Sequence, residues 1–409
     1  MSFSFNNNDN NRLTPNAAPA QPTQPAQPTA SPNLNAATFG VAPDAPQPTQ
    51  PIPPTQPAQP IPPTQPTQPI PPTQPAQPIP PTQPTQPLLA DAATRRFADA
   101  YRRLVAEIEK AFVGQRELVV GTLVALFSGG HVLVESVPGL GKTLFAQALG
   151  RALGCRFGRV QFTPDLTPSD VVGALVFNAK EQEFTFRPGP IFTQILLADE
   201  INRSPAKTHA ALLEATQEGA ATIDGQTHPL PRPFFTIATQ NPIESEGTYR
   251  LPEAQLDRFM FKLVADYPSA EEELKILVAH GKNVDLKTKL DAIEPVLAAE
   301  EILELTALVD GVYVAPQLFE YVAKIVRATR DFPRLAFGAS PRAGLALVQG
   351  ARVLAAFEGR GYATPDDVAR LTLPTLRHRV VLSPEAEIEG RRVDDVLTAL
   401  LRSIEVPRL

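Results

Sequence analysis

The stretch HVLVESVPGLGKT, residues 131–143, decides the fold of this chain. Its first five residues are mainly apolar and predict a buried strand, and the apolar pattern over residues 144–153 predicts a helix. A glycine-rich turn between a strand and a helix is the context of a phosphate-binding loop, because backbone amides and the helix N-terminus both attract an anion there. The stretch therefore predicts an α/β fold that binds a nucleotide at the end of the strand.

The loop itself, residues 136–143, contains side chains with distinct expected roles. Lys142 is expected to neutralise the β- and γ-phosphates, and Thr143 is expected to hold Mg²⁺ through its hydroxyl. The remaining residues are expected to surround the phosphates with their backbone: Ser136, Val137, Pro138, Gly139, Leu140 and Gly141. The common form of this Walker A motif begins with glycine. Serine stands in that place here, so we expect a more restricted turn.

A second apolar strand, expected at residues 195–198, ends in two carboxylates, Asp199 and Glu200. Ligands of open α/β sheets bind outside the carboxyl ends of the strands. We therefore expect Asp199 to bind Mg²⁺ through water and Glu200 to polarise the attacking water as a general base, as in a Walker B motif. A solvated acidic strand end is the alternative, and the phosphate loop earlier in the chain argues against it.

The pattern around these two motifs divides the chain into three regions. Strands and helices alternate over residues 89–267, which predicts a nucleotide-binding domain with a parallel sheet. Its other strands are expected at 159–162, 234–239 and 259–265, and two hairpins are expected at 173–186 and 221–230. Residues 268–409 have a helical pattern almost to the end and predict a second, all-helical domain.

Residues 1–88 differ from the rest in composition. Of the 46 prolines in the chain, 26 precede Leu88, and the segment has little that could form a core. We expect it to be disordered. A nine-residue unit, QPIPPTQPA or QPIPPTQPT, fills residues 50–85 four times, with proline at every third position as in a polyproline II helix. The repeat predicts a semi-rigid spacer, and a binding motif for a partner is the alternative.

Charge and composition exclude several classes of protein. The net charge of −6 gives no basic footprint for a nucleic acid. No apolar run is long enough to predict a membrane span, and the N-terminus lacks the basic and apolar regions of a secretory signal. The single cysteine excludes an internal disulfide and fits a reducing compartment. We therefore expect a cytoplasmic protein.

The order of motifs along the chain resembles the AAA+ ATPases and, among them, the MoxR family. The resemblance rests on VGQ at 113–115, VPGLGKT at 137–143, FTPDLTPSD at 162–170, RPGPIF at 187–192, LLADEINR at 196–203, ALLEATQEG at 211–219, ATQNPIESEGTYRLPEAQLDRF at 238–259 and ASPRA at 339–343. It extends over nearly all of residues 90–405 and leaves out the proline-rich tail. It implies a P-loop AAA+ core followed by a helical lid domain.

The resemblance also implies roles for two residues after the later strands. Asn241 takes the sensor 1 position, where an amide orients water against the γ-phosphate; a turn residue at the strand end is the alternative. Arg258 takes the arginine-finger position and reaches the nucleotide of a neighbouring subunit. An ion pair with Asp257 or Glu253 is the alternative for Arg258.

Two further sites follow from the resemblance. Arg342 takes the sensor 2 position in the first turn of a lid helix that begins at Ser340-Pro341, and an ordinary surface arginine is the alternative. Gly114 and Gln115 match the loop that lies near adenine, and a plain helix connector is the alternative. The sequence does not decide whether Arg203 senses nucleotide state at the subunit edge.

The activity implied by the resemblance is Mg²⁺-dependent ATP hydrolysis in a ring, with a hexamer expected. The work done would be chaperone-like remodelling or activation of a client protein, with a von Willebrand A-domain protein as a partner. A metal-chelatase motor subunit and a nucleic-acid motor are the alternatives. The hairpin tips argue against nucleic acid, because residues 224–228 contain no Lys or Arg and residues 180–183 are net acidic. A non-catalytic scaffold is disfavoured because Lys142 and Glu200 are both present.

Overall fold

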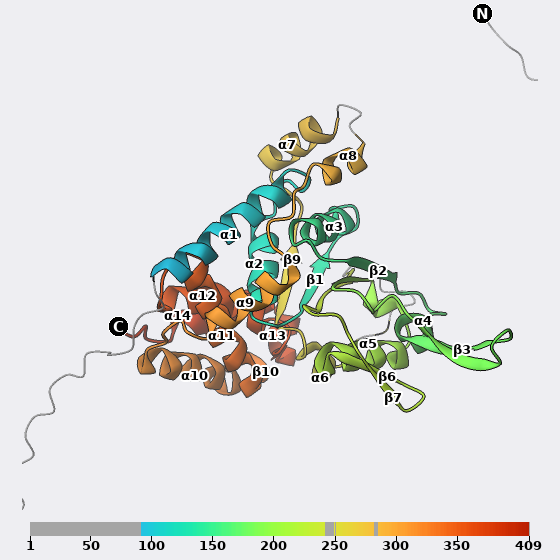
Figure 1. Cartoon of the computed structure of the whole chain (residues 1–409). Coiled ribbons are helices and arrows are strands. Elements are labelled where there is room, and N and C mark those ends of the chain that lie inside the picture. Colours follow the sequence, from blue (N-terminus) through green and yellow to red (C-terminus); the bar gives the residue numbers. More distant parts are fainter. Residues whose placement is uncertain (1–90, 242–248, 250, 282–284, 409) are drawn as a thin grey trace, which may run out of the picture. The chain divides into compact units, whose positions relative to one another are not determined.

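The computed structural model of the chain describes residues 91–241, 249, 251–281 and 285–408. They belong to one compact unit, which spans residues 79–409. The tail predicted at residues 1–88, with its repeat at 50–85, lies outside the described residues, so its disorder stays a prediction. Within the compact unit, a sheet with its covering helices is followed by a largely helical C-terminal part (Figure 1).

A five-stranded parallel sheet forms the centre of the nucleotide-binding part (Figure 1). Its strands lie in the order β2 (Phe157–Gln161), β5 (Ile195–Asp199), β8 (Phe235–Gln240), β1 (Val132–Ser136) and β9 (Phe261–Ala265). Each neighbouring pair is parallel, which confirms the fold class predicted from the alternating pattern. The order places β5 and β1 on either side of β8, so both motif-bearing strands end at the same edge of the sheet.

Both faces of the sheet are covered, which explains why its strands are almost wholly apolar. Val132 and Val134 of β1 belong to a hydrophobic cluster that includes residues of α1 (Asp91–Glu109), α2 (Arg116–Phe127) and α3 (Lys142–Ala152). Leu133 of the same strand belongs to a second cluster, with residues of α5 (Ala206–Glu218). Successive side chains of a strand point to opposite faces, so one strand contributes to two cores.

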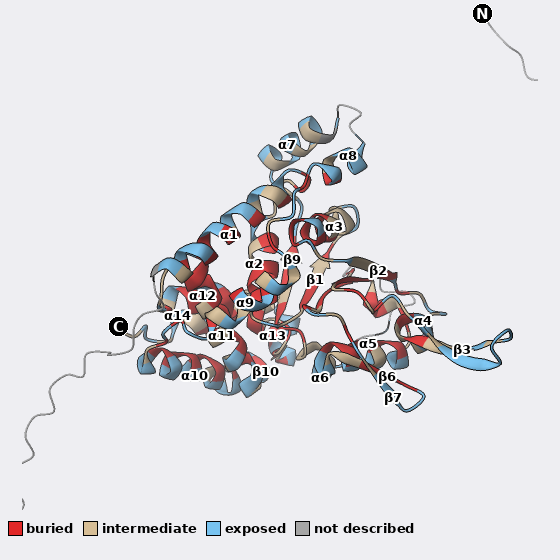
Figure 2. Cartoon of the chain, in the orientation of Figure 1, coloured by how far each residue is buried: buried red, intermediate tan, exposed pale blue. Residues whose placement is uncertain are grey.

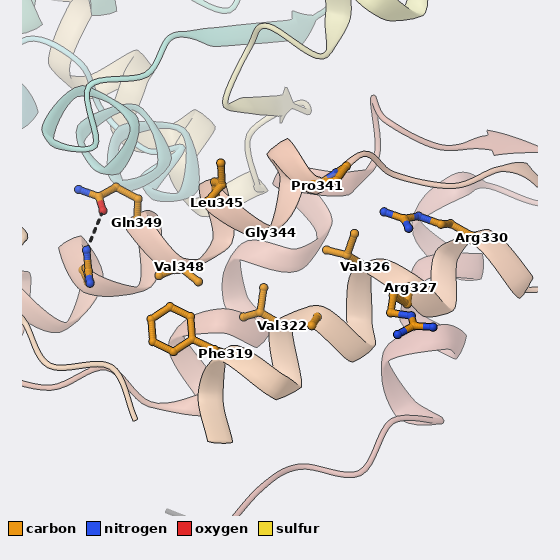
Figure 3. A pocket seen from close by; sticks show the side chains of 12 residues that line it. Phe319, Val322, Val326, Arg327, Arg330, Pro341, Gly344, Leu345, Val348 and Gln349 are labelled. Atoms are coloured by element: carbon orange, nitrogen blue, oxygen red, sulfur yellow. Dashed lines mark hydrogen bonds between the residues drawn. The ribbon is translucent and has the colours of Figure 1, made fainter. Parts of the chain in front are cut away.

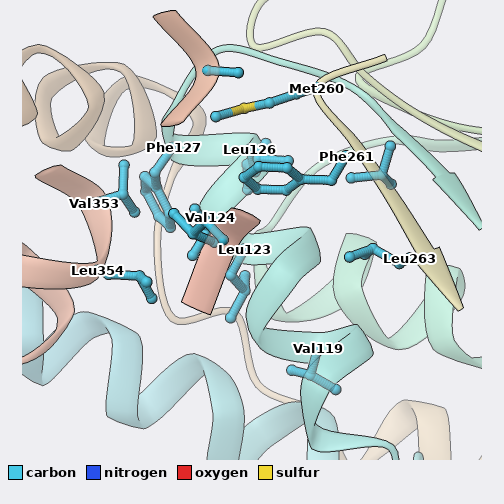
Figure 4. Packing of buried hydrophobic residues seen from close by; sticks show 14 of the residues in the cluster. Val119, Leu123, Val124, Leu126, Phe127, Met260, Phe261, Leu263, Val353 and Leu354 are labelled. Carbon is cyan, nitrogen blue, oxygen red and sulfur yellow. The ribbon is translucent and has the colours of Figure 1, made fainter. Parts of the chain in front are cut away.

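The first cluster continues from the sheet into the helical part of the chain. Figure 4 shows its centre, where Phe127 of α2, Phe261 of β9 and Leu354 of α11 (Pro341–Phe357) pack together. The helical part is therefore joined to the sheet by a shared core. The predicted division at residues 267 and 268 falls after the last strand of the sheet and stays a prediction.

Short elements interrupt the βα pattern on the side of α5. They are α4 (Pro168–Val172), the antiparallel hairpins β3 (Gly173–Asn178) with β4 (Glu183–Pro188) and β6 (Ala220–Ile223) with β7 (Gln226–Pro229), a 3₁₀ turn (Ile201–Arg203) and α6 (Glu253–Leu256). Both predicted hairpins are thus present. The outer part of β3–β4 is exposed, including the aromatic pair Phe177 and Phe184, whose ring centroids are 5.3 Å apart (Figure 2).

The C-terminal part is helical except for one short ladder. Its helices are α7 (Ala270–His280), α8 (Leu286–Asp291), α9 (Ala299–Val309), α10 (Pro316–Asp331), α11, α12 (Pro365–Leu376), α13 (Pro384–Ile388) and α14 (Val393–Arg402). Strands β10 (Leu335–Phe337) and β11 (Val381–Leu382) pair antiparallel. Proline at the first helical position starts α10 to α13, because its fixed φ suits that position and no amide is needed there. None of the described helices combines the length and apolar character of a membrane span.

Candidate active site

The sheet register gathers the predicted site residues at one edge. β8 pairs with β5 through Ala198 and Ala238, and with β1 through Glu135 and Gln240. Asp199 is the last residue of β5 and Ser136 is the last residue of β1, and Asn241 directly follows β8. The Walker B carboxylates, the sensor 1 amide and the start of the phosphate loop therefore lie outside the carboxyl ends of three adjacent strands, where ligands of such sheets bind.

The phosphate loop has the backbone that its glycines allow. Gly139 and Gly141 have φ of 87° and 78°, and the latter is the residue before α3. Ser136 closes β1 and is not among the described residues with positive φ, so this place does not need the conformational freedom of glycine, and the restriction of the turn stays a prediction. Its hydroxyl donates to the carbonyl of Val137 at 3.2 Å. Lys142 Nζ donates to the carbonyl of Ser136 at 3.4 Å, which holds its charge over the loop.

A cavity of about 380 Å³ lies beside the loop. Gly139 and Gly141 form part of its wall, and apolar side chains form most of the rest, among them Phe112, Leu140, Leu144, Ile276 and Leu277. Such a chamber suits the planar base of a nucleotide whose phosphates occupy the loop.

Gln115 is one of the polar residues that line this cavity, with Glu273 and Tyr267. Gln115 has a left-handed backbone with φ 51°, directly after Gly114 with φ 83°. The backbone N–H of Gln115 donates to Glu272 Oε1 at 3.3 Å. Its Nε2 donates to the carbonyl of Asp266 at 3.4 Å, whereas its buried Oε1 has no partner among the described residues. An unpaired buried acceptor is costly and fits a ligand that donates a hydrogen bond, such as an exocyclic amine.

Asp199 is held rigidly at the end of β5. It is 7 % exposed, its Oδ1 accepts from Thr239 Oγ1 at 2.6 Å, and its Oδ2 accepts from Arg159 at 2.7 Å. Each carboxylate oxygen keeps a second lone pair for a water molecule. The arrangement fits a Mg²⁺ ion held through water by Asp199 and directly by the Thr143 hydroxyl, which has no partner among the described residues.

Glu200 has a strained backbone and a restrained side chain. Its φ of 56° is left-handed, a conformation that costs about 1 kcal/mol or more in a non-glycine residue and concentrates at functional sites. Its N–H donates to Thr239 Oγ1 at 2.9 Å. Its Oε2 accepts from Gln161 at 2.7 Å and from Arg203 at 3.0 Å. These two bonds orient the carboxylate and leave Oε1 available for water.

Asn241 is buried directly after β8, as a residue acting on a bound nucleotide at this edge would be. The sequence left the role of Arg203 open. In the structure its guanidinium forms an ion pair with Glu200 at 3.0 Å, so it lies at the same site. The site thus unites the loop, both carboxylates, Asn241 and Arg203.

The two arginines predicted to be the finger and sensor 2 do not line the cavity beside the phosphate loop. Arg258 and Arg342 line a separate hollow of about 230 Å³, together with Gly130 and Thr216. None of the phosphate-loop residues lines that hollow. The ion pairs of Asp257 within the described residues are with Arg342 and Arg379 and not with Arg258, so the Asp257 half of the predicted alternative is not seen there.

Asp257 is instead bound by the helical part of the chain. Its carboxylate accepts from Arg379 at 2.7 Å and from Ser340 Oγ at 3.2 Å, and Arg342 lies 3.7 Å away. Arg379 also donates to the carbonyls of Asp257 and Phe259, on both sides of Arg258, at 3.1 and 2.7 Å. Burial lowers the pKa of Arg379, and the ion pair with Asp257 opposes this shift. The segment that carries Arg258 is therefore attached to the lid.

Ser340 and Pro341 occupy the expected N-cap and first positions of α11, but the Ser340 hydroxyl binds Asp257 and does not cap the helix. Arg159, Gln161 and Arg379 are the contacts that sequence reasoning missed. Arg159 and Gln161 belong to β2, the strand next to β5, so only knowledge of the strand order could have pointed to them. Arg379 contacts residues about 120 positions earlier, and a basic cluster at 377–379 was its only signal.

Comparison with known proteins identifies the family. Residues 131–261 match the model of the ATPase family associated with various cellular activities (AAA), and residues 327–400 match the AAA lid domain. The uncharacterized protein YeaC of Bacillus subtilis is 47 % identical over 305 residues, which cover 75 % of this chain and 94 % of that protein. The chaperone MoxR1 of Mycobacterium tuberculosis is 42 % identical over 316 residues, which cover 75 % of this chain and 82 % of that protein.

A solved structure agrees with these relatives. The crystal structure of a proposed ATPase from Cytophaga hutchinsonii superposes with a TM-score of 0.72 at 36 % identity, covering 78 % of this chain and 98 % of that one. The fold, the order of the motifs and the relatives agree along most of the chain. The chain therefore belongs to the MoxR family of AAA+ ATPases.

Proposed function

We propose that this protein hydrolyses ATP with Mg²⁺ as a ring of identical subunits and uses the energy to remodel a client protein. One observation carries the proposal. The phosphate loop, the β5 carboxylates and Asn241 converge on one edge of the sheet, while Arg258 and Arg342 share a different surface. A complete site then needs two subunits, each contributing one of these surfaces.

Within one subunit, the residues divide the work of phosphoryl transfer to water. The loop amides and Lys142 bind the phosphates, and Thr143 and Asp199 would hold Mg²⁺, which would supply charge neutralisation of the phosphate oxygens. Glu200 Oε1 accepts the proton of the attacking water, and its other oxygen is held by Gln161 and Arg203. Asn241 orients that water.

The neighbouring subunit completes the site in this proposal. Arg258 and Arg342 line one hollow and would approach the same nucleotide from outside, where they stabilise the charge that develops on the transferred phosphoryl group. Sensor 2 would thus act across the interface, with the finger. Repetition of this head-to-tail contact closes a ring, for which we expect six subunits.

A protein client is supported by the β3–β4 hairpin. Phe177 and Phe184 expose most of an aromatic pair at a position where a nucleic-acid motor would need cationic side chains. The chaperone named among the relatives supports the same choice. A von Willebrand A-domain partner is a part of the proposal that rests on the family resemblance alone, and a cytoplasmic location is a part that rests on the composition of the sequence.

Mixing two inactive variants tests the proposal. Arg258→Ala removes one surface of the site and Glu200→Gln removes the other, so each variant alone should lose at least about 100-fold in turnover. In mixed rings some interfaces pair an intact Arg258 with an intact Glu200, and a measurable part of the activity should return. Mixtures that assemble but stay inactive at every ratio would show that Arg258 does not act in trans.

A further inference from the structure

A groove of about 640 Å³ runs between α10 and α11 (Figure 3). Val322 and Val326 form its floor with Gly344, whose missing side chain would meet both valines at 3.6–3.7 Å. Phe319 and Leu345 stand along its sides, and Leu345 is 73 % exposed. The groove is therefore an apolar surface that nothing in the described part of the chain covers.

The rim of the groove is basic. Arg327, Arg330 and Arg352 all line it. Arg330 donates to the carbonyl of Ala339, and Arg352 lies 3.7 Å from Asp310. Arg327 is exposed and has no partner among the described residues (Figure 3). An apolar floor with a cationic rim fits an amphipathic helix that carries acidic residues beside its apolar stripe.

Among the described helices, α7 presents an exposed apolar face of this kind. In α7, Leu274 and Val278 are 62 % and 60 % exposed, although both are apolar. Glu271 lies on the same stripe, three residues before Leu274, and the first turn of the helix also contains Glu272 and Glu273. Glu272 is already engaged, because its carboxylate accepts from the backbone N–H groups of Ser269 and Gln115, and Glu273 lines the cavity beside the phosphate loop. Glu271 is therefore the acid that this stripe presents to a cationic rim.

We propose that α7 of one subunit docks in the α10–α11 groove of the neighbouring subunit. The inference rests on the proposed function, because it deepens the same head-to-tail contact. Helix α7 lies at the opposite end of the helical part from α10 and α11, which form the groove, so α7 is remote from the groove of its own chain (Figure 1). A second copy is then the occupant with the matching shape and charge.

The position of both surfaces supports this contact. Pro341, at one end of the groove, directly precedes Arg342, which we place against the neighbour's nucleotide. Leu277 of α7 lines the cavity beside the phosphate loop. When Arg342 of one copy approaches the phosphate loop of another, the groove of the first therefore comes next to α7 of the second. The tail of the same chain is a poorer occupant, because its three charged residues, Asp9, Arg12 and Asp44, cannot match a cationic rim.

Site-specific crosslinking of the full chain tests the contact. Leu345→Cys places a thiol at the groove and Val278→Cys places one on α7, and both positions are exposed. The natural Cys155 is a weak background reagent, because burial raises the pKa of its thiol to about 11. A mixture of the two variants with ATP should form at least about fivefold more disulfide-linked dimer than either variant alone. Equal yields, or crosslinks confined to each variant alone, would overturn the proposal.

Charge reversal gives a second, independent measurement. Arg327→Glu and Glu271→Lys should each raise the protein concentration for half-maximal turnover about tenfold, and together they should return it to within about threefold of the wild type. Lys324→Glu, on the same helix but outside the groove, is the matched control and should leave it unchanged. No effect of Arg327→Glu, or the same effect of Lys324→Glu, would overturn the docking.

The trans-acting role of Arg258 and the α7 contact are distinguished by different outcomes of these experiments. Recovery of activity in the Arg258→Ala and Glu200→Gln mixture, together with absent crosslinks, would leave the ring intact and remove the α7 contact. Crosslinks without that recovery would establish the contact and remove Arg258 as a finger.

Discussion

Glu200 unites a left-handed backbone, a fixed Oε2 and a free Oε1, which are the properties of an oriented base. Glu200→Gln keeps the size and the hydrogen-bonding capacity of the side chain and removes its basicity. We expect turnover to fall at least about 100-fold while nucleotide affinity changes by less than about threefold. Lys142→Ala should instead weaken nucleotide binding itself and lower the affinity at least about tenfold. Steady-state ATPase assays and calorimetric nucleotide titration measure both quantities, and wild-type turnover in Glu200→Gln would refute its role.

His378 is a buried imidazole beside the finger segment. Its Nε2 lies 2.9 Å from the carbonyl oxygen of Phe259. Burial, and the positive charges of Arg379, Lys262 and Arg377, hold its pKa well below the ordinary value. The ring is therefore neutral in the folded chain and takes up a proton on unfolding below about pH 6.5. The free energy of unfolding should fall by about 1.4 kcal/mol for each further pH unit from this residue alone.

Comparison with His378→Gln isolates that contribution. Glutamine keeps an N–H donor for Phe259 and does not titrate. Urea denaturation below about pH 6.5 should show a pH slope smaller by about 1.4 kcal/mol per unit in the variant, whereas above about pH 7 the two slopes should agree. Parallel slopes in the two proteins would mean that His378 is not the titrating group.

At the scale of elements, the periodic segments were the predictable part. The five strands, both hairpins and the helix after the phosphate loop lie close to their expected positions, because each is either a continuous apolar run or a 3.6-residue pattern. Helix α4 has five residues and the β10–β11 ladder has fewer, so neither shows a period in the sequence. The order of the strands could not be predicted from the sequence either. The contacts of Arg159 with Asp199 and of Gln161 with Glu200 depend on that order, so they could not be predicted.

The attachment of the finger segment to the lid was unpredictable for the same reason, and it yields a testable role. Arg379 does not touch the nucleotide in our proposal; it is a positioning residue for Arg258. Arg379→Gln should lower turnover about tenfold or more while nucleotide affinity stays within about twofold. Arg377→Gln, which loses a 3.0 Å ion pair with Asp394 inside the lid, is the matched control for stability.

A mixing experiment separates positioning from a general loss of structure. Arg379→Gln subunits have an intact Glu200, so they should regain activity when mixed with Glu200→Gln subunits. They should regain none with Arg258→Ala subunits, because both variants damage the same surface. Recovery with both partners, or with neither, would argue against the positioning role.

At the scale of the whole molecule, the proline-rich tail and the compact unit have separable expected roles. The tail has three charged residues and little apolar surface outside its regularly spaced isoleucines, so we expect it to contribute nothing to phosphate binding. Deletion of residues 1–87 should leave turnover per subunit within about twofold, as measured at a concentration where rings are complete. A large loss of activity or of assembly would assign the repeat a structural role.

Helix α7 has one face on the nucleotide cavity, through Ile276 and Leu277, and another at the proposed subunit contact, through Leu274 and Val278. A single rigid helix of eleven residues then serves two binding equilibria. Thermodynamic linkage makes their effects mutual: whatever factor ATP contributes to the subunit association constant, association contributes equally to the affinity for ATP. Ring formation and nucleotide retention would rise and fall together, so that dilution alone would release nucleotide.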